Sequence, residues 1–363
     1  MPRRVHNFNA GPAALPLPVL EQVQRDLLDF AGSGMSILEL THRSAMYEEV
    51  HNQAIADLRT LLRGSEEYAI LFMGGGAQTQ FALVPMNLSP ARAHADYLIT
   101  GPWSMTALQE AQKLGDAHVL WTSANTHFDR VPTPPFAYQL DPEAAYLHYT
   151  SNNTIVGTQY AIVPEAGDVS LVCDMSSDFL SRPVEVSRFG LIYAGAQKNA
   201  GPAGVTIVVI RQDLLERCPA DLPSPFSYAQ VAAKNSLLNT PPVFAIYIVG
   251  LVARYLLEQG GLAAIATHNA DKARLLYAAI DASAGFYQGL AQPHSRSLMN
   301  VTFRLPTSEL ETRFLTASTA AYLIGLQGHR AAGGLRASLY NAVSLASVQA
   351  LVAFMEDFQQ RWG

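Results

Sequence analysis

The stretch AGAQKNAGPAGV, residues 194–205, places a single lysine, Lys198, among small residues and directly before the β-branched run 205–210. Lysine side chains are mostly exposed to solvent, whereas a run of this composition is typical of a buried strand. A lysine at the point where the chain turns back into a core therefore needs a particular reason. The segments before and after it indicate what that reason is.

Short apolar runs alternate with helical patterns on both sides of this stretch, over residues 67–210. Such alternation is typical of βαβ units around a mostly parallel sheet. We predict crossover helices at 79–88 and 104–114, and strands at 68–73, 97–100, 119–122, 146–149, 171–174, 191–194 and 205–210. The predicted fold class is therefore α/β, with a large domain built on a mostly parallel seven-stranded sheet.

The pattern changes in the C-terminal third of the chain. We expect a buried helix over 243–257, capped by Thr240 and ended by Gly260-Gly261. The elements predicted after it are a helix at 262–281, a strand at 298–305, a helix at 308–326, a short strand at 335–339 and a helix at 345–361. This order predicts a smaller α+β domain over 259–363, joined by residues 1–15, beside a large domain over 16–258.

Composition excludes several classes of protein. The 363 residues are 49% hydrophobic and 15% charged, and the net charge is −6, so we expect a well-buried globular protein that binds no nucleic acid. The longest apolar stretch, 243–257, contains Arg254 and is shorter than the roughly 18 residues of a spanning helix, so we expect no membrane partner.

Cysteine usage and the N-terminus point to the cytoplasm. The two cysteines, Cys173 and Cys218, have no metal-ligand spacing, so we predict no metal site. No apolar leader follows Met1, which together with the low cysteine content predicts a cytoplasmic location.

An acidic residue, Asp174, ends the apolar run 170–173 upstream of Lys198. Ligands of open α/β sheets bind at the carboxyl ends of the strands, where both residues are expected. A carboxylate and a lysine at two strand ends can equally form a simple salt bridge. The pair by itself leaves a structural and a catalytic interpretation open.

Three further strand ends carry residues suited to a planar phosphorylated ligand. Gly74-Gly75-Gly76 precedes a predicted helix, where backbone N–H groups bind phosphate, although a tight turn would also require glycine. Trp103 is placed to stack on a ring, although most tryptophans fill cores. Thr154 belongs to a polar segment that is otherwise a turn. Pyridoxal 5′-phosphate needs this set, with the lysine as its Schiff-base partner and the carboxylate on its pyridine nitrogen.

Five stretches of the chain carry a further signal: NFNAGP at 7–12, LELTHR at 38–43, GPWS at 101–104, and residues 194–204 and 328–340. They resemble the phosphoserine aminotransferases, class V members of the fold-type I pyridoxal-phosphate enzymes, and the similarity spans nearly the whole chain. The resemblance implies a homodimer whose active site is shared between subunits, with Lys198 and Asp174 catalytic. It also implies cofactor contacts from Gly76, Ala77, Gln78, Trp103, Thr154, Asp174, Gln197, Lys198 and, from the other subunit, Asn239 and Thr240.

The resemblance assigns the substrate to five basic residues: His42, Arg43, His329, Arg330 and Arg336. The planar fork of Arg336 suits a carboxylate common to both amino-acid substrates. The other four would bind the side-chain anion, which is a phosphate in one half-reaction and a carboxylate in the other. Without the resemblance, His42-Arg43 and His329-Arg330 are ordinary solvated pairs.

The implied reaction transfers the amino group of L-glutamate to 3-phosphooxypyruvate and yields O-phospho-L-serine and 2-oxoglutarate. Lys198 would hold the cofactor and then act as the general base. The same family resemblance leaves 3-hydroxy-2-oxo-4-phosphooxybutanoate, a substrate of pyridoxine biosynthesis, as a further acceptor. The alternatives are a serine or alanine aminotransferase, a cysteine desulfurase, for which Cys173 and Cys218 are poorly placed, and a non-catalytic dimeric binding module.

Overall fold

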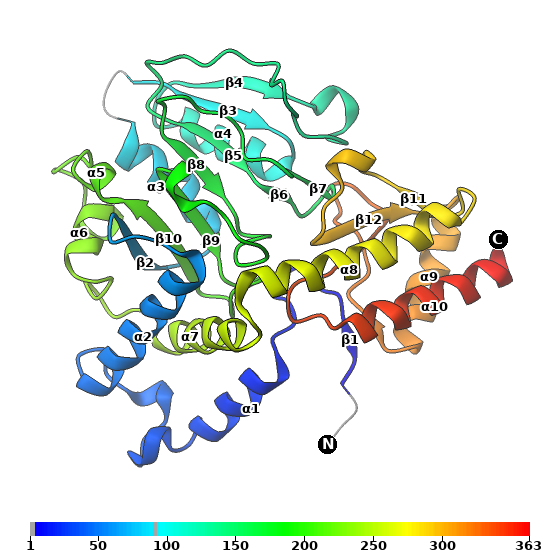
Figure 1. Cartoon of the computed structure of the whole chain (residues 1–363), viewed down its shortest axis with the longest axis horizontal. Coiled ribbons are helices and arrows are strands. Elements are labelled where there is room, and N and C mark those ends of the chain that lie inside the picture. The colour runs from blue at the N-terminus through cyan, green and yellow to red at the C-terminus, as the bar shows by residue number, and fades with distance from the viewer. Residues whose placement is uncertain (1–3, 90–92) are drawn as a thin grey trace.

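The computed structural model describes residues 4–89 and 93–363, and its centre is a seven-stranded sheet (Figure 1). The strand order is β2-β10-β9-β8-β5-β3-β4, and only β10 runs antiparallel to its neighbours. The bounds are β2 Tyr68–Gly74, β3 Ala95–Ile99, β4 Ala117–Thr122, β5 Leu147–Thr150, β8 Leu171–Asp174, β9 Leu191–Gly195 and β10 Val205–Arg211. The predicted α/β fold class is confirmed, and the seven expected strands differ from these bounds by at most two residues at either end.

Both faces of the sheet are buried, because its strands are apolar on both sides. Along β10, Ile207 and Val209 join one hydrophobic cluster and Val208 and Ile210 join another. The first cluster includes residues of α2 (Ala45–Leu62) and α7 (Val243–Glu258), and the second includes residues of α3 (Ala77–Leu88) and α4 (Pro102–Gln112). The sheet is therefore the middle of three layers, with helices on both of its faces, and the ends of its strands lie at the edges of this arrangement.

A smaller unit follows, built on the three-stranded sheet β11-β12-β14. Its strands are β11 Gln288–Gly289, β12 Asn300–Arg304 and β14 Leu335–Ser338, and its helices are α8 Gly261–Ala282, α9 Ser308–Ala320 and α10 Leu345–Trp362. A third hydrophobic cluster joins these elements and takes in Phe8 from the N-terminal segment. That cluster supports the division we propose, with a large domain over 16–258 and a small domain over 259–363 that includes residues 1–15.

One expected helix ends earlier than predicted, and one expected helix cap is wrong. The helix predicted over 308–326 ends at Ala320, because Tyr322 has a left-handed φ of 62° and Leu323–Ile324 form β13. This strand pairs in parallel with β1, His6–Asn7, a strand that the sequence pattern did not reveal. Thr240 does not cap α7, since the helix begins at Val243 with Pro242 as its N-cap residue and no side-chain cap hydrogen bond.

The remaining elements are short or peripheral. They are α1 Leu17–Asp26, α5 Gln212–Leu215, α6 Tyr228–Ala233, and the hairpin strands β6 Asn152–Asn153 and β7 Thr158–Gln159. Across residues 4–89 and 93–363, no single helix has the length and apolar composition of a membrane span; α7 and α8 reach them only as a pair bent by 84°.

Candidate active site

Lys198 lies just beyond β9, in a turn at the carboxyl edge of the sheet, as its position in the sequence predicted. Its Nζ donates hydrogen bonds to Thr154 Oγ1 at 2.7 Å and to Ser177 Oγ at 2.9 Å, and these two hydroxyls also bond to each other. Thr154 follows β6 and Ser177 follows β8, so three separate connections converge on one amine.

The surroundings of Lys198 make its amine easier to deprotonate than that of an ordinary lysine. Burial lowers its pKa to about 8, the negative charge of Asp174 opposes that shift, and the positive charge of Arg336 adds to it. An amine with this pKa has a substantial nucleophilic fraction near neutral pH.

Asp174, the last residue of β8, is 5% exposed. Its Oδ1 accepts a hydrogen bond from the Ser176 backbone N–H at 2.9 Å, and the Ser176 side chain also hydrogen-bonds the carboxylate. Burial raises the pKa of Asp174, whereas the Lys198 ammonium lowers it. A buried carboxylate is costly unless a cation pairs with it, and no residue of the described chain forms a salt bridge with Asp174. A protonated pyridine nitrogen fits that requirement, so the residues present suit pyridoxal 5′-phosphate.

The connection after β3 is held against the hairpin that follows β5. Asn153 Nδ2 donates to Thr100 Oγ1 and Thr158 Oγ1, both at 3.0 Å. Gly101 lies so close to Asn153 that a Cβ there would collide with the amide. This contact fixes the start of α4, where Trp103 is partly buried against the second hydrophobic cluster.

The glycine loop lies between β2 and α3. Gly75 has a φ of 93°, which favours glycine, and Gly76 is the N-cap of α3. The helix begins at Ala77, two residues before the predicted start, so the N–H groups of Ala77 and Gln78 lie in its first turn, where anions bind. The side chain of Gln78 is exposed.

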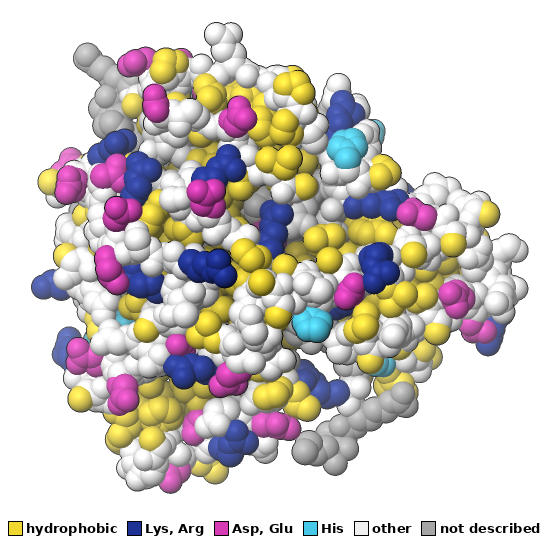
Figure 2. Space-filling model, in the orientation of Figure 1, with side chains coloured by type: hydrophobic (Ala, Val, Ile, Leu, Met, Phe, Trp, Pro, Cys, Tyr) yellow, Lys and Arg dark blue, Asp and Glu magenta, His cyan; other side chains and the backbone are white. Residues whose placement is uncertain are grey.

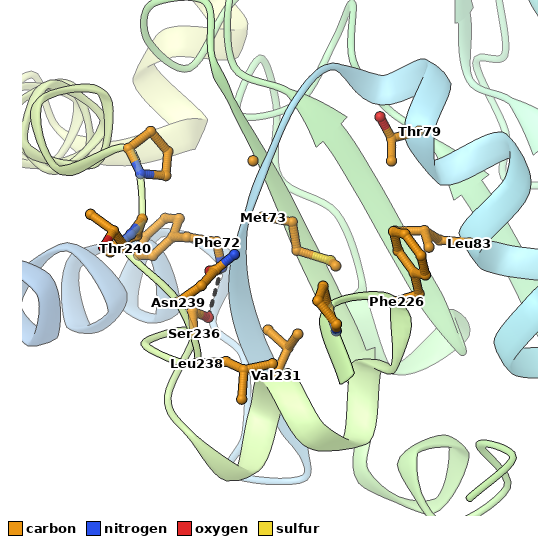
Figure 3. A pocket seen from close by; sticks show the side chains of 14 residues that line it. Phe72, Met73, Thr79, Leu83, Phe226, Val231, Ser236, Leu238, Asn239 and Thr240 are labelled. Carbon is orange, nitrogen blue, oxygen red and sulfur yellow. Dashed lines mark hydrogen bonds between the residues drawn. The ribbon is translucent and has the colours of Figure 1, made fainter. Parts of the chain in front are cut away.

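Asn239 and Thr240 are exposed on the segment that leads to α7 (Figure 3). With Gly74 and Thr79 of the same chain they line a pocket of about 210 Å³. In the described residues neither side chain contacts Lys198. Their predicted role toward the other subunit stays a prediction.

The N-terminal segment covers the lysine turn. The Ala13 N–H donates to the Gln197 carbonyl at 2.9 Å. Gly11 has a φ of 143°, and a Cβ there would lie 3.3 Å from Lys198 Cγ. The NFNAGP stretch therefore packs against Lys198 itself.

A group of basic side chains comes from the small domain. Arg336, in β14, donates through Nη1 to the Thr154 carbonyl at 3.0 Å, and its buried Nε has no partner in the described chain. Burial and then the charges of Arg336 and Arg330 lower the pKa of His329. The charges of Arg336 and Arg330 both reach His329, and the charge of Arg336 also reaches Lys198, so we refer to these three residues as the cationic region.

His42 and Arg43 lie in the connection before α2. Arg43 is exposed, and across the described ranges its side chain makes no hydrogen bond or ion pair. No contact within these ranges of the single chain joins the pair to His329 and Arg330. The structure therefore brings Arg336, His329 and Arg330 together but leaves His42 and Arg43 apart from them.

Ser177 is a site residue that the sequence reasoning missed. The only available signal was its place three residues after Asp174, where a turn brings the chain back over the strand end. Cys173 is fully buried in β8 and Cys218 lies beyond α5, and within the described residues neither forms a hydrogen bond with Lys198. This placement disfavours the desulfurase alternative.

Comparison with known proteins agrees with this geometry. A family model described as aminotransferase class-V matches residues 5–351. A phosphoserine aminotransferase of Desulfatibacillum aliphaticivorans is 54% identical, and the match covers 100% of both chains. The phosphoserine aminotransferase structure from Bacillus circulans subsp. alkalophilus is 50% identical with a TM-score of 0.97, over 99% of both chains.

A more distant solved structure carries the cofactor in its description. The PLP-bound phosphoserine aminotransferase from Trichomonas vaginalis is 37% identical with a TM-score of 0.92, over 97% of this chain and 100% of that one. The chain therefore belongs to the phosphoserine aminotransferases, within the class V aminotransferase family.

Proposed function

We propose that this chain transfers the amino group of L-glutamate to 3-phosphooxypyruvate, giving O-phospho-L-serine and 2-oxoglutarate. One observation carries the proposal: Asp174 and Arg336 both lie close enough to Lys198 to change its pKa, so an amine, a buried carboxylate and a guanidinium share one site. Full-length identity of 54% to a phosphoserine aminotransferase supports the choice of substrate.

Pyridoxal 5′-phosphate, when bound, supplies an electron sink for the carbanion that forms at the substrate Cα. In the proposed site Lys198 Nζ holds it covalently, Asp174 pairs with its ring nitrogen, Trp103 stacks on the ring and Thr154 bonds its hydroxyl. The proposed phosphate contacts are Gly76, Ala77, Gln78 and Gln197, with Asn239 and Thr240 from the other subunit.

Lys198 has a second proposed role, as the base that moves a proton from the substrate Cα once the substrate has displaced it. Thr154 and Ser177 accept hydrogen bonds from Nζ, so they orient the amine. Because the pKa is about 8, the amine can take up a proton and release it again near neutral pH.

The proposed substrate contacts form two groups, one for the α-carboxylate and one for the side-chain anion. Arg336 binds the α-carboxylate that both amino acids share, since its Nε is buried and still lacks a partner in the described chain. His329 and Arg330, with His42 and Arg43, bind the phosphate or the side-chain carboxylate.

The proposed assembly is a homodimer. Hydrophobic side chains gather at the lower left of Figure 2, over the segment between α1 and α2, where Leu28 is 84% exposed and Leu38 58%. Beside it a cavity of about 540 Å³ is lined by Met46, Val50 and Leu251. Apolar surface of this kind favours association.

Subunit mixing tests the shared site. Lys198→Ala and the double variant Asn239→Ala/Thr240→Ala should each have little activity as homodimers. After mixing under conditions that exchange subunits, a hybrid contains one site with an intact Lys198 and an intact partner loop, so activity should return. Mixtures no more active than their components would refute the sharing of the site.

Two finer statements belong to the same proposal. We place the enzyme in the cytoplasm, because its two cysteines are free.

We also propose 3-hydroxy-2-oxo-4-phosphooxybutanoate as a second acceptor, since it offers the same phosphate and 2-oxo acid to the cationic region. Amino transfer to that acid from L-glutamate, measured as released 2-oxoglutarate, tests the second point.

Half-reactions test the main proposal. The purified holoenzyme is mixed separately with O-phospho-L-serine, L-glutamate, L-serine and L-alanine, and conversion of the cofactor to its amine form is followed by absorbance. Conversion by the two acidic amino acids alone is expected, because only these carry a side-chain anion. Equal conversion by serine or alanine would support aminotransferase activity but would refute the proposed choice of substrate.

A further inference from the structure

A cluster of metal-ligating side chains lies at the amino edge of the sheet, opposite the edge that carries Lys198. His94 precedes β3, Asp96 is the second residue of β3, and His118 is the second residue of β4. One ligand atom from each of the three lies within 4.8 Å of the other two. The cluster shares no residue with the proposed active site.

The sheet register explains why these side chains meet. Asp96 and His118 are directly paired in the parallel β3–β4 ladder, so their side chains point to the same face. His94 is two residues before Asp96 and lies on the same side, with its ring stacked on that of His118 at 4.9 Å between centroids. Asp96 and His118 are 22 positions apart in the chain (118 − 96), so the sequence does not reveal this arrangement.

The carboxylate of Asp96 is the strongest sign of a missing ligand. Its side chain is 5% exposed and has a hydrogen bond from the Asp141 backbone, yet among the described residues its nearest cationic partner is His118 Nδ1 at 4.0 Å, beyond hydrogen-bond distance. A buried carboxylate in this state is costly unless a cation neutralises it. The His118 side chain is 59% exposed on the edge strand, which leaves an open path from solvent.

Asp141 completes the group. It lies 3.2 Å from His94 Nε2, the contact by which carboxylates orient metal-binding histidines in known sites. This contact places the proton on Nε2 and leaves the lone pair of Nδ1 for an ion. Two imidazoles and a carboxylate are the ligand set of many zinc sites, with a fourth position left to water.

We propose that His94, Asp96 and His118 bind one Zn²⁺ ion, with Asp141 as the group that orients His94. Tetrahedral ligands about 2.1 Å from zinc lie about 3.4 Å apart, so no pair of ligand atoms needs to approach by more than about 1.4 Å. The exposed His118 ring is the ligand with the most freedom to move. The ion would tie β4, at the sheet edge, to β3 and to the loop that holds Asp141.

Zinc titration of the metal-free holoenzyme against a chromophoric chelator tests the proposal. We expect one ion per chain, a loss of about 10-fold to 100-fold in affinity for Asp141→Asn, and a larger loss for His118→Ala. Free zinc at 100 times the dissociation constant should raise the folded-to-unfolded ratio of the wild type about 100-fold and leave that of His118→Ala unchanged.

His268→Ala is the matched control, because His268 is an exposed histidine on α8, in the small domain. It should bind zinc as the wild type does. Three results would each overturn the proposal. They are no zinc bound by the wild type, wild-type zinc affinity in both His118→Ala and Asp141→Asn, and a loss of zinc affinity in His268→Ala as large as that in His118→Ala. Aminotransferase activity should be the same in all these variants, since none of the residues lies at the Lys198 edge.

Discussion

Burial of Lys198 should make its amine react at a much lower pH than an ordinary lysine. Its pKa is lowered to about 8 from 10.5, first by burial and then by the charge of Arg336. At pH 7 a pKa of about 8 leaves about 9% of the amine neutral, whereas a pKa of 10.5 leaves about 0.03%. The site therefore multiplies the reactive fraction about 300-fold.

Competitive acetylation of the cofactor-free chain measures this directly. The protein is treated with a small amount of labelled acetic anhydride over a range of pH, and the Lys198 peptide is quantified by mass spectrometry. A free lysine amide in the same mixture, with a pKa of about 10.4, is the reference. Limited access lowers the maximal rate of a half-buried amine but does not move the midpoint, which we expect near pH 8.

Two variants give shifts of opposite sign. Asp174→Asn removes a negative charge that raises the Lys198 pKa, so its midpoint should fall below that of the wild type. Arg336→Gln removes a positive charge that lowers it, so its midpoint should rise. A wild-type midpoint equal to that of the free amide, or shifts in the same direction in both variants, would refute the reasoning.

Three further predictions concern binding and stability. Arg336→Lys keeps the charge but loses the planar fork, so kcat/KM for L-glutamate and O-phospho-L-serine should fall about 10-fold to 100-fold in steady-state assays. Gly157→Ala places a Cβ, at a φ of 78°, against the side chain of a β12 threonine and should lower the free energy of unfolding by about 2 kcal/mol or more. Gly115→Ala meets no atom within 4 Å and should change it by less than about 0.5 kcal/mol in the same urea titration. Lys272→Met removes the donor to three buried carbonyls, at 2.8, 2.8 and 3.0 Å, and should cost about 3 kcal/mol or more, whereas Lys113→Met, at an exposed side chain, should cost less than about 0.5 kcal/mol. Equal stability within either matched pair would contradict the corresponding prediction.

Local pattern was sufficient for the α/β class and for all seven strands of the large sheet. Each strand is a short apolar run bounded by turn residues, and its composition depends only on burial of both faces. The same logic located Asp174 and Lys198, because a polar residue at the end of a buried run must lie at the edge of the sheet.

Pairing between distant segments was not accessible in this way. The antiparallel placement of β10 between β2 and β9, and the pairing of β1 with β13, join residues far apart in the chain. The helix predicted to run through β13 shows the difference, since local propensity favoured helix until pairing with β1 required extended backbone.

The amino-acid sequence by itself therefore determined the layers of the fold and the chemical groups available, because both depend on residue type and local spacing. The tertiary structure alone decided which groups meet. Ser177 reaches Lys198, and His94 meets His118, only because connections and strands from separate parts of the chain converge at opposite edges of one sheet. Such contacts depend on strand order and register, which follow from the packing of the whole molecule.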